Sequence, residues 1–200
     1  MLTRRDFLKV TAIGGAFASI GSMHEAKAVV KPALPDEAFA YESGRKIPLI
    51  EETDIVVVGG SARAVAAAVA AAKSGSQVYL VCDLPYLGEE VCASHLYERE
   101  KDEELQTTLA RRIFQSASIP TPMAVKKTLE DALIDNGVKF LYSSYVTNVL
   151  VDAAGEAAGV VIANRSGREA IRCKAIIDAT HEAVVAGFLN AERTPFQPCE

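Results

Sequence analysis

The sequence predicts an α/β fold built on a parallel β-sheet, and three features of residues 54–83 carry this prediction. The apolar run Ile55–Val58 ends at two glycines, as expected for a short strand that is buried on both faces. An alanine-rich helix then occupies Ser61–Lys73, and Gly75 follows where a left-handed cap belongs. Because this helix is apolar on every side, we expect it to be buried all round. A second buried strand, Val78–Val81, ends just before an acidic residue.

The order of these segments is typical of the βαβ unit that binds a nucleotide. Unpaired N–H groups and the helix dipole attract a pyrophosphate to the start of the helix. Glycines in the preceding turn let the backbone come close to that group. The three fingerprint positions hold Gly59, Ser61 and Ala64, so only the first glycine of the usual motif is kept, with Gly60 beside it. A βαβ unit that binds no nucleotide is the alternative.

This stretch resembles the FAD-binding domain of the FAD-dependent oxidoreductase family, and the resemblance covers residues 50–195. Two differences from the family pattern concern the cofactor. The family's ribose-binding acid aligns with Cys82, so Asp83 lies one place late, and Glu89 stands where a second glycine is common. The resemblance implies a Rossmann-like FAD/NAD(P)-binding domain, a parallel sheet with a β-meander crossover, and FAD as the cofactor. The matching positions are Asp54, Gly59, Gly60, Ala66–Ala68, Gly75, Val81 and Leu87–Gly88.

The resemblance also implies which residues contact the cofactor. The backbone of Val146 is expected at the adenine edge, and Ala179 and Thr180 beside the ADP part. His181 stands where the family has glycine, and we expect a surface histidine that caps the next helix, with contact to the pyrophosphate as the alternative. No residue is predicted to be catalytic. The full predicted set is Gly59, Gly60, Ser61, Ala62, Arg63, Ala64, Cys82, Asp83, Gly88, Val146, Ala179, Thr180 and His181.

Residues 120–180 predict one further helix and a series of short strands. The helix spans Met123–Asn136, with Val125, Leu129, Leu133 and Ile134 on its apolar face and Gly137 as its cap. Turns are expected at 153–155 and 164–167. A meander in this place favours an FAD domain over a nicotinamide-binding domain, which continues with regular βα alternation. The expected strands are Lys139–Tyr142, Tyr145–Val151, Ala157–Ala163, Glu169–Cys173 and Ala175–Thr180.

The remaining patterns indicate few other functions. Residues 101–116 predict an amphipathic helix through Leu105, Leu109 and Ile113. The spacing of Cys92 and His95 supplies only two ligands, so no metal site is predicted. There is no basic stripe or aromatic platform, which argues against nucleic-acid binding. The four cysteines do not form a recognisable disulfide framework, and the net charge of −5 is mild.

The first 28 residues resemble a twin-arginine (Tat) export signal, through which bacteria export folded proteins. Arg4-Arg5 precede a modestly apolar run that is too short to span a membrane, and Ala26-Lys27-Ala28 resembles a cleavage site. An ordinary secretory signal is the alternative. Residues 29–50 are then an extended lead-in, and 51–200 the FAD-binding domain. We expect a periplasmic or secreted protein that uses the Tat export machinery and keeps no stable membrane anchor after cleavage.

The function that follows is an FAD-dependent oxidoreductase, of which this chain supplies the ADP-binding half of the flavin domain. The alternatives are a non-catalytic nucleotide-binding or interaction domain derived from such a flavoprotein and, third, an NAD(P)-dependent dehydrogenase. The family's C-terminal Gly-Asp element and substrate domain are not found in the sequence, so the domain is expected to be truncated at its C-terminus. Its small-molecule substrate and electron acceptor are unknown.

Overall fold

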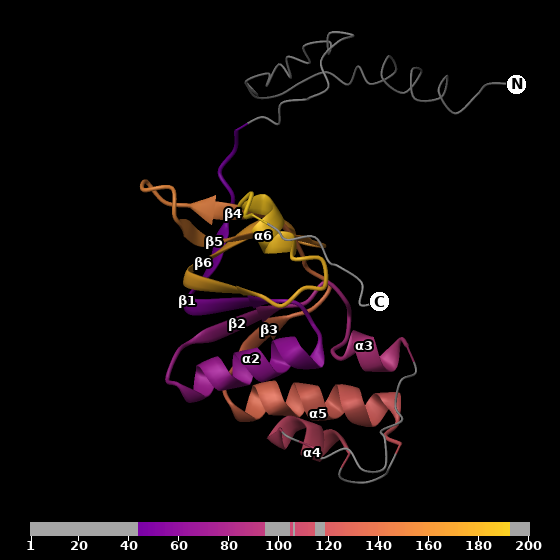
Figure 1. Ribbon diagram of the computed structural model, residues 1–200. Helices are drawn as coiled ribbons and strands as arrows, with labels where there is room; N and C mark the ends of the chain where they lie inside the picture. Colours follow the sequence, from indigo (N-terminus) through magenta and orange to yellow (C-terminus); the bar gives the residue numbers. More distant parts are fainter. Residues whose placement is uncertain (1–43, 95–104, 106, 115–118, 193–200) are drawn as a thin grey trace, which may run out of the picture. The chain divides into compact units, whose positions relative to one another are not determined.

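The computed structural model describes residues 44–94, 105, 107–114 and 119–192. The expected export signal and most of the lead-in lie outside the described residues. The six-stranded sheet has the order β3-β2-β1-β6-β5-β4 (Figure 1). Four strands are parallel: β1 (Leu49–Val58), β2 (Val78–Val81), β3 (Lys139–Leu141) and β6 (Gly167–Asp178). The other two, β4 (Tyr145–Val151) and β5 (Ala157–Asn164), form an antiparallel hairpin that pairs with β6. This arrangement confirms the predicted α/β fold with its meander.

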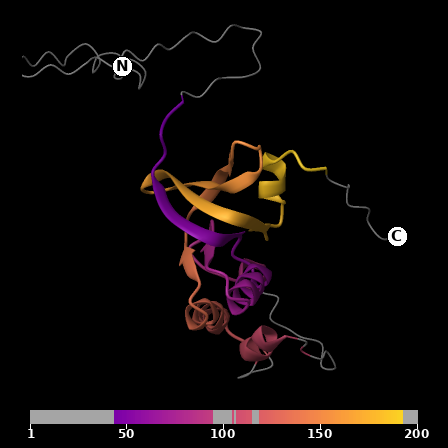
Figure 2. The same ribbon diagram turned by 90° about the vertical axis from the view of Figure 1, so that its left-hand side faces the viewer.

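Three helices form a layer on one face of the parallel strands. Helices α2 (Ala62–Lys73) and α5 (Pro122–Asp135) lie side by side there, and α4 (Thr108–Ile113) packs against α5 (Figures 1 and 2). Two short helices, α3 (Glu89–Cys92) and α6 (Val184–Phe188), follow β2 and β6 respectively. No helix in the described part of the chain is both long and apolar enough to cross a membrane.

The end of β1 is buried on both faces, as predicted. Val57 belongs to the apolar cluster that contains the buried side chains of α2 and α5. Val56 and Val58 belong to a second cluster, with Val160 of β5 and Val185 of α6. The sheet therefore curls until its own hairpin covers the face that α2 and α5 leave open. Burying apolar side chains on both faces is what makes this strand the centre of the fold.

The predictions for two elements are corrected by the structure. Helix α2 is not buried all round, because Ala66 and Ala70 on its outer side are exposed. The sheet and α5 cover its inner side. In α5, Val125, Leu129 and Leu133 are buried as predicted, but Ile134 is 59% exposed. Sequence periodicity places a residue on a helix face, and neighbouring elements decide how wide the covered part of that face is.

The expected strands at 169–173 and 175–180 are one continuous strand, β6, which corrects the predicted boundary between them. Both halves pair with β1, since Cys173 lies opposite Thr53 and Ala175 opposite Ile55. Lys174 does not interrupt the ladder: its side chain points outward, where Nζ lies 2.7 Å from Asp54 Oδ1. β1 is likewise longer than predicted and begins at Leu49.

A tight connection after β3 brings the start of β4 back to the parallel strands. The N–H of Ser144 donates to the carbonyl of Cys82 at 3.0 Å, and the N–H of Ser143 donates to Leu84 at 3.1 Å. Asn164, the last residue of β5, lies beside the start of β4, and its Nδ2 is 3.3 Å from Ser144 Oγ. Ser144 is buried and joins three segments. The start of β4 therefore lies beside the segment that follows β2.

Candidate functional site

A groove of about 800 Å³ lies where β1, β2 and β6 end and α2 begins. In open α/β sheets a ligand binds in the crevice outside the carboxyl ends of the strands. Most of the residues predicted to contact the cofactor come together here, and the others lie behind the lining. Those that line the groove are Gly59, Gly60, Ser61, Arg63, Asp83, Val146, Ala179, Thr180 and His181. Those that do not are Ala62, Ala64, Cys82 and Gly88.

The turn after β1 is held between β2 and the segment that follows β6. The N–H of Gly59 donates to Val81 O at 2.8 Å, and the N–H of Ala179 donates to Val58 O at 2.9 Å. Gly59 has a φ of +127°, and a Cβ on it would lie 2.7 Å from the carbonyl oxygen of Ala179. Glycine is therefore required here both by the backbone angle and by the neighbouring main chain.

Cys82 lies beneath this turn and not on the groove. Its side chain is completely buried, and a Cβ on Gly60 would collide with its Sγ. The thiol donates to the carbonyl of Tyr86, and burial raises its pKa to about 11. At neutral pH it is an uncharged, buried group. The next residue, Asp83, is exposed and lines the groove, so the acidic side chain that reaches the groove from the end of β2 is Asp83.

The first turn of α2 already has two of its N–H groups engaged. Ser61 is the N-cap, and its Oγ accepts from the N–H of Ala64 at 3.1 Å. The N–H of Ala62 donates to Oε1 of Glu90, 28 residues away in α3, at 2.6 Å. Helix α2 has no acidic residue in its own first turn, so Glu90 supplies the negative charge at this dipole end.

The loop after β6 is organised by Asp178. Its Oδ1 accepts from the N–H and the hydroxyl of Thr180, and its Oδ2 accepts from the N–H groups of Val185 and Ala186. The hydroxyl of Thr180 also accepts from Val184 N at 2.9 Å. Asp178 and Thr180 thus cap α6, a role that was expected for His181. His181 is an exposed residue at the groove.

Sequence reasoning missed two side chains that shape this site. Glu90 and Asp178 both line the groove and both accept backbone N–H bonds at helix starts. An acidic residue that directly precedes Ala-Thr was a usable signal for Asp178, because carboxylates favour helix starts. Nothing in the local sequence indicates the partner of Glu90, since the contact joins two distant segments.

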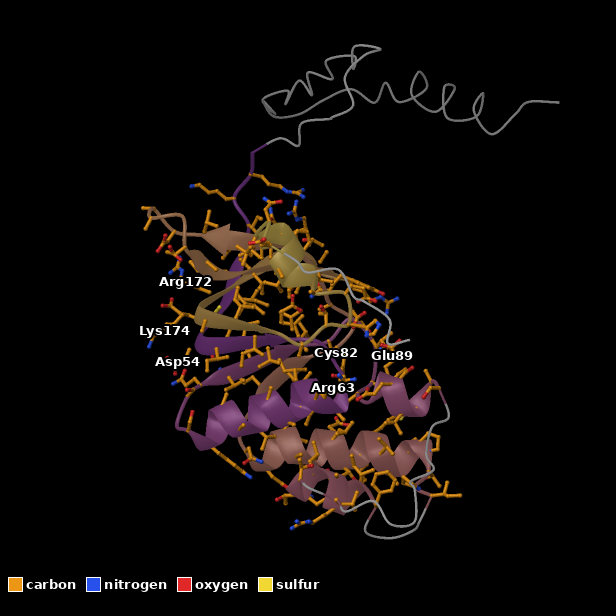
Figure 3. The ribbon with its side chains drawn as sticks, viewed as in Figure 1. Asp54, Arg63, Cys82, Glu89, Arg172 and Lys174 are labelled. Atoms are coloured by element: carbon orange, nitrogen blue, oxygen red, sulfur yellow. The ribbon has the colours of Figure 1, made fainter. Side chains whose placement is uncertain are left out.

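The charges on the groove are mostly negative. Arg63 and His181 are its basic lining residues, and Figure 3 shows Arg63, Cys82 and Glu89 at the end of the sheet opposite Asp54, Arg172 and Lys174. No group of three or more metal-ligating side chains occurs within the residues that the structure describes. The carboxylates of the lining are Asp83, Glu89, Glu90, Asp178 and Glu182.

Comparison with known proteins identifies the fold and the family. The structure resembles that of THI4 from Thermovibrio ammonificans, with a TM-score of 0.53 and 19% identity over 70% of this chain and 62% of that one. It also resembles a geranylgeranyl bacteriochlorophyll reductase-like protein from Thermoplasma acidophilum, with a TM-score of 0.52 and 18% identity over 69% of this chain and 42% of that one. The chain thus covers less than two thirds of either protein. No curated protein matches it by sequence.

The model of one protein family, described as FAD dependent oxidoreductase, matches residues 54–194. The matched range begins within β1, includes every lining residue of the groove and ends after α6. The chain therefore belongs to the FAD dependent oxidoreductase family and forms the FAD-binding part of a flavoprotein.

Proposed function

We propose that this chain holds the ADP part of FAD in an exported oxidoreductase. The observation that carries the proposal is the position of the groove, between the glycine turn after β1, the start of α2 and the Ala-Thr segment after β6. Its volume of about 800 Å³ suits a bound cofactor, since such sites usually measure roughly 300–1,000 Å³. The residues that line the groove thus fit the ADP part in shape, whereas their charge is unfavourable for a pyrophosphate.

Each part of the groove has a role in this proposal. The main chain of Gly59–Ser61 and the first turn of α2 would hold the pyrophosphate. Asp83 would accept from the ribose, and Val146 would lie at the adenine. Ala179, hydrogen-bonded to Val58 O, and Thr180, hydrogen-bonded to Asp178, would lie beside the ADP part. When bound, FAD supplies hydride or electron transfer with a substrate, and the protein supplies binding and orientation.

A charge placed on the N-cap of α2 tests the proposed site. Ser61→Asp keeps a good N-cap residue but adds a negative charge where the pyrophosphate would lie. We expect it to weaken FAD binding by at least about tenfold with little loss of stability, because like charges in a confined site repel. Thr107→Asp is the matched control: Thr107 caps α4 in the same way, with Oγ1 3.1 Å from Ala110 N.

Titration of each purified protein with FAD, followed by flavin fluorescence and by thermal unfolding, gives the measurement. Equal affinity in the two variants would place the cofactor elsewhere. If the wild-type chain binds no flavin even at high FAD concentration, the alternative is favoured, namely a nucleotide-binding or interaction domain that has lost the cofactor.

The export route and the catalytic activity are also proposals. The twin arginine and apolar run of the first 28 residues support export through the twin-arginine pathway, which carries folded proteins and so suits a chain loaded with cofactor before export. Oxidoreductase activity is inferred from the family.

A further inference from the structure

The start of α2, where the proposed function places the pyrophosphate, already carries an anion from the chain itself. The N–H of Ala62 lies 2.6 Å from Glu90 Oε1, a short distance that indicates a charge-assisted hydrogen bond. The positive end of a twelve-residue helix strengthens this contact. A carboxylate at a helix start uses the same donors as a phosphate oxygen.

The backbone around Glu90 is fixed in place, so this contact does not depend on a loose side chain alone. Gly88 N donates to Gly60 O at 2.8 Å, which ties the segment before α3 to the turn before α2. Gly88 has a φ of +79°, and a Cβ on it would lie 2.7 Å from Leu129 Cδ1 in α5. Ser94 Oγ donates to the carbonyl of Glu90 on the other side. These contacts direct the side chain of Glu90 towards α2.

The second oxygen of the Glu90 carboxylate has no hydrogen bond that would offset the cost of its burial. Glu90 Oε2 is buried and has no hydrogen-bond partner among the described residues. A buried charged oxygen without a donor is costly, because it has lost its water and gained nothing in return. One oxygen of the Glu90 carboxylate therefore makes a strong hydrogen bond to Ala62, while the burial of the other oxygen is unfavourable. A carboxylate held in this way can be displaced by a ligand that offers an oxygen to the same N–H group.

We propose that Glu90 is a built-in substitute for phosphate, which occupies the α2 start in the cofactor-free chain and must leave when FAD binds. This proposal rests on the proposed function. A pyrophosphate oxygen and the Glu90 carboxylate cannot share the N–H of Ala62, because both are anions and the groove already has an excess of carboxylates. Glu90 thus lowers the affinity for the dinucleotide, and in the free chain it accepts the hydrogen bond from the N–H of Ala62.

The test compares two neighbouring charge removals. Glu90→Gln removes the charge that contacts Ala62 and keeps the shape of the side chain. Glu89→Gln removes an equal charge from an exposed side chain that lines the same groove without contacting α2. ADP and FAD are titrated into full-length, flavin-free wild type and both variants at one ionic strength, by calorimetry.

We expect Glu90→Gln to bind both ligands at least about tenfold more tightly than wild type, and Glu89→Gln to gain less than about threefold, because only the first variant removes the charged competitor at the Ala62 N–H. The amide signal of Ala62 in a ¹⁵N-labelled chain provides a second readout. It should shift on mutation of Glu90 in the free protein, and should become the same in wild type and variant once FAD is bound.

Equal gains for the two variants, or an Ala62 signal that still depends on residue 90 in the FAD complex, would overturn the proposal while leaving FAD binding intact. A complete absence of ADP and FAD binding in all three proteins would remove the proposed function and this proposal with it. The two failures are therefore distinguishable.

Discussion

The Sγ atom of Cys82 fills the space beside Gly60 that a side chain at Gly60 would need. Cys82 follows β2 and Gly60 follows β1, so the contact joins the two strand ends that border the groove. The resemblance aligns the family's ribose-binding acid with Cys82, and in this chain the thiol packs under the turn. Gly60 and Cys82 should therefore behave as one unit in mutagenesis.

Substitution of Gly60 by alanine should destabilise the chain only while Cys82 is present. The added methyl group collides with a buried sulfur, and overpacking of this kind costs about 1–3 kcal/mol. In a Cys82→Ala background the space is free, so the cost should fall well below that value. Urea denaturation of the four proteins in this double-mutant cycle measures the coupling. Gly44→Ala is the control, because a Cβ there meets no atom within 4 Å.

The stability of the chain should fall between pH 9 and pH 11 through Cys82. Burial raises the pKa of this thiol from 9.0 to about 11. Below pH 9 the thiol is protonated in both states and its contribution is complete. Above pH 9 the unfolded chain ionises first and is favoured, so about 2 kcal/mol should be lost by pH 11. The pKa of Tyr142 is also raised, to about 12, so the effect of Cys82 has to be separated from it.

Chemical denaturation across this pH range, in wild type and Cys82→Ala, separates the two groups. The variant should show a shallower decline above pH 9. The remaining slope belongs to Cys173, whose pKa burial also raises, and to the tyrosines. Parallel slopes in the two proteins would show that the thiol is not buried as described.

Replacement of Asp178 by asparagine should loosen the segment that borders the groove after β6. Four hydrogen-bond donors of Thr180, Val185 and Ala186 point at this carboxylate. In asparagine an NH₂ group replaces one of the two accepting oxygens, so the donors on that side lose their acceptor. A loss of about 1–3 kcal/mol is expected, since buried donors are left unpaired. Faster hydrogen exchange confined to residues 179–188 would localise the effect. Glu182→Gln removes a charge from an exposed side chain of the same loop and should leave exchange unchanged.

Export should depend on the paired arginines. Arg4→Lys together with Arg5→Lys keeps the positive charge of the leader and removes the guanidinium pair that the twin-arginine pathway requires. We expect the double variant to accumulate in the cytoplasm of a bacterial host while a single Lys9→Arg control is exported. Cell fractionation and immunoblotting measure this. Delivery of the double variant to the periplasm at the wild-type level would favour an ordinary secretory signal.

The fold could be predicted because its central signals are local. The run Ile55–Val58, the glycines that end it and the alanine helix lie within one stretch, and strand β2 has the bounds that were expected. β4 also has its expected bounds, Tyr145–Val151, and the strand expected at Lys139–Tyr142 ends one residue earlier, at Leu141. The division of β6 was wrong because Lys174 looks like a break in the sequence, whereas in the sheet it is an outward position with an acidic neighbour on β1.

The groove could be located from the sequence, but its detailed chemistry could not. Gly59, Thr180 and Val146 were brought together as expected, because the strand order fixes which chain ends meet. The contact between Glu90 and Ala62 depends on how the segment after β2 folds back onto α2. That return depends on the hydrogen bond from Gly88 to Gly60 and on the lack of a side chain at Gly88, where a Cβ would collide with Leu129 of α5. Neither periodicity nor spacing in the sequence predicts it.

The continuity of β6 has a consequence for how this chain can vary in length. One end of the strand pairs with the hairpin at Gly167 and the other ends at Asp178 on the groove. Adding or deleting one residue within β6 would move every side chain on one side of that position to the opposite face of the sheet. The turn at 153–155, where Gly155 has open space around it, can absorb such an event instead. Natural length changes are therefore expected at that turn, with β6 keeping a constant twelve residues.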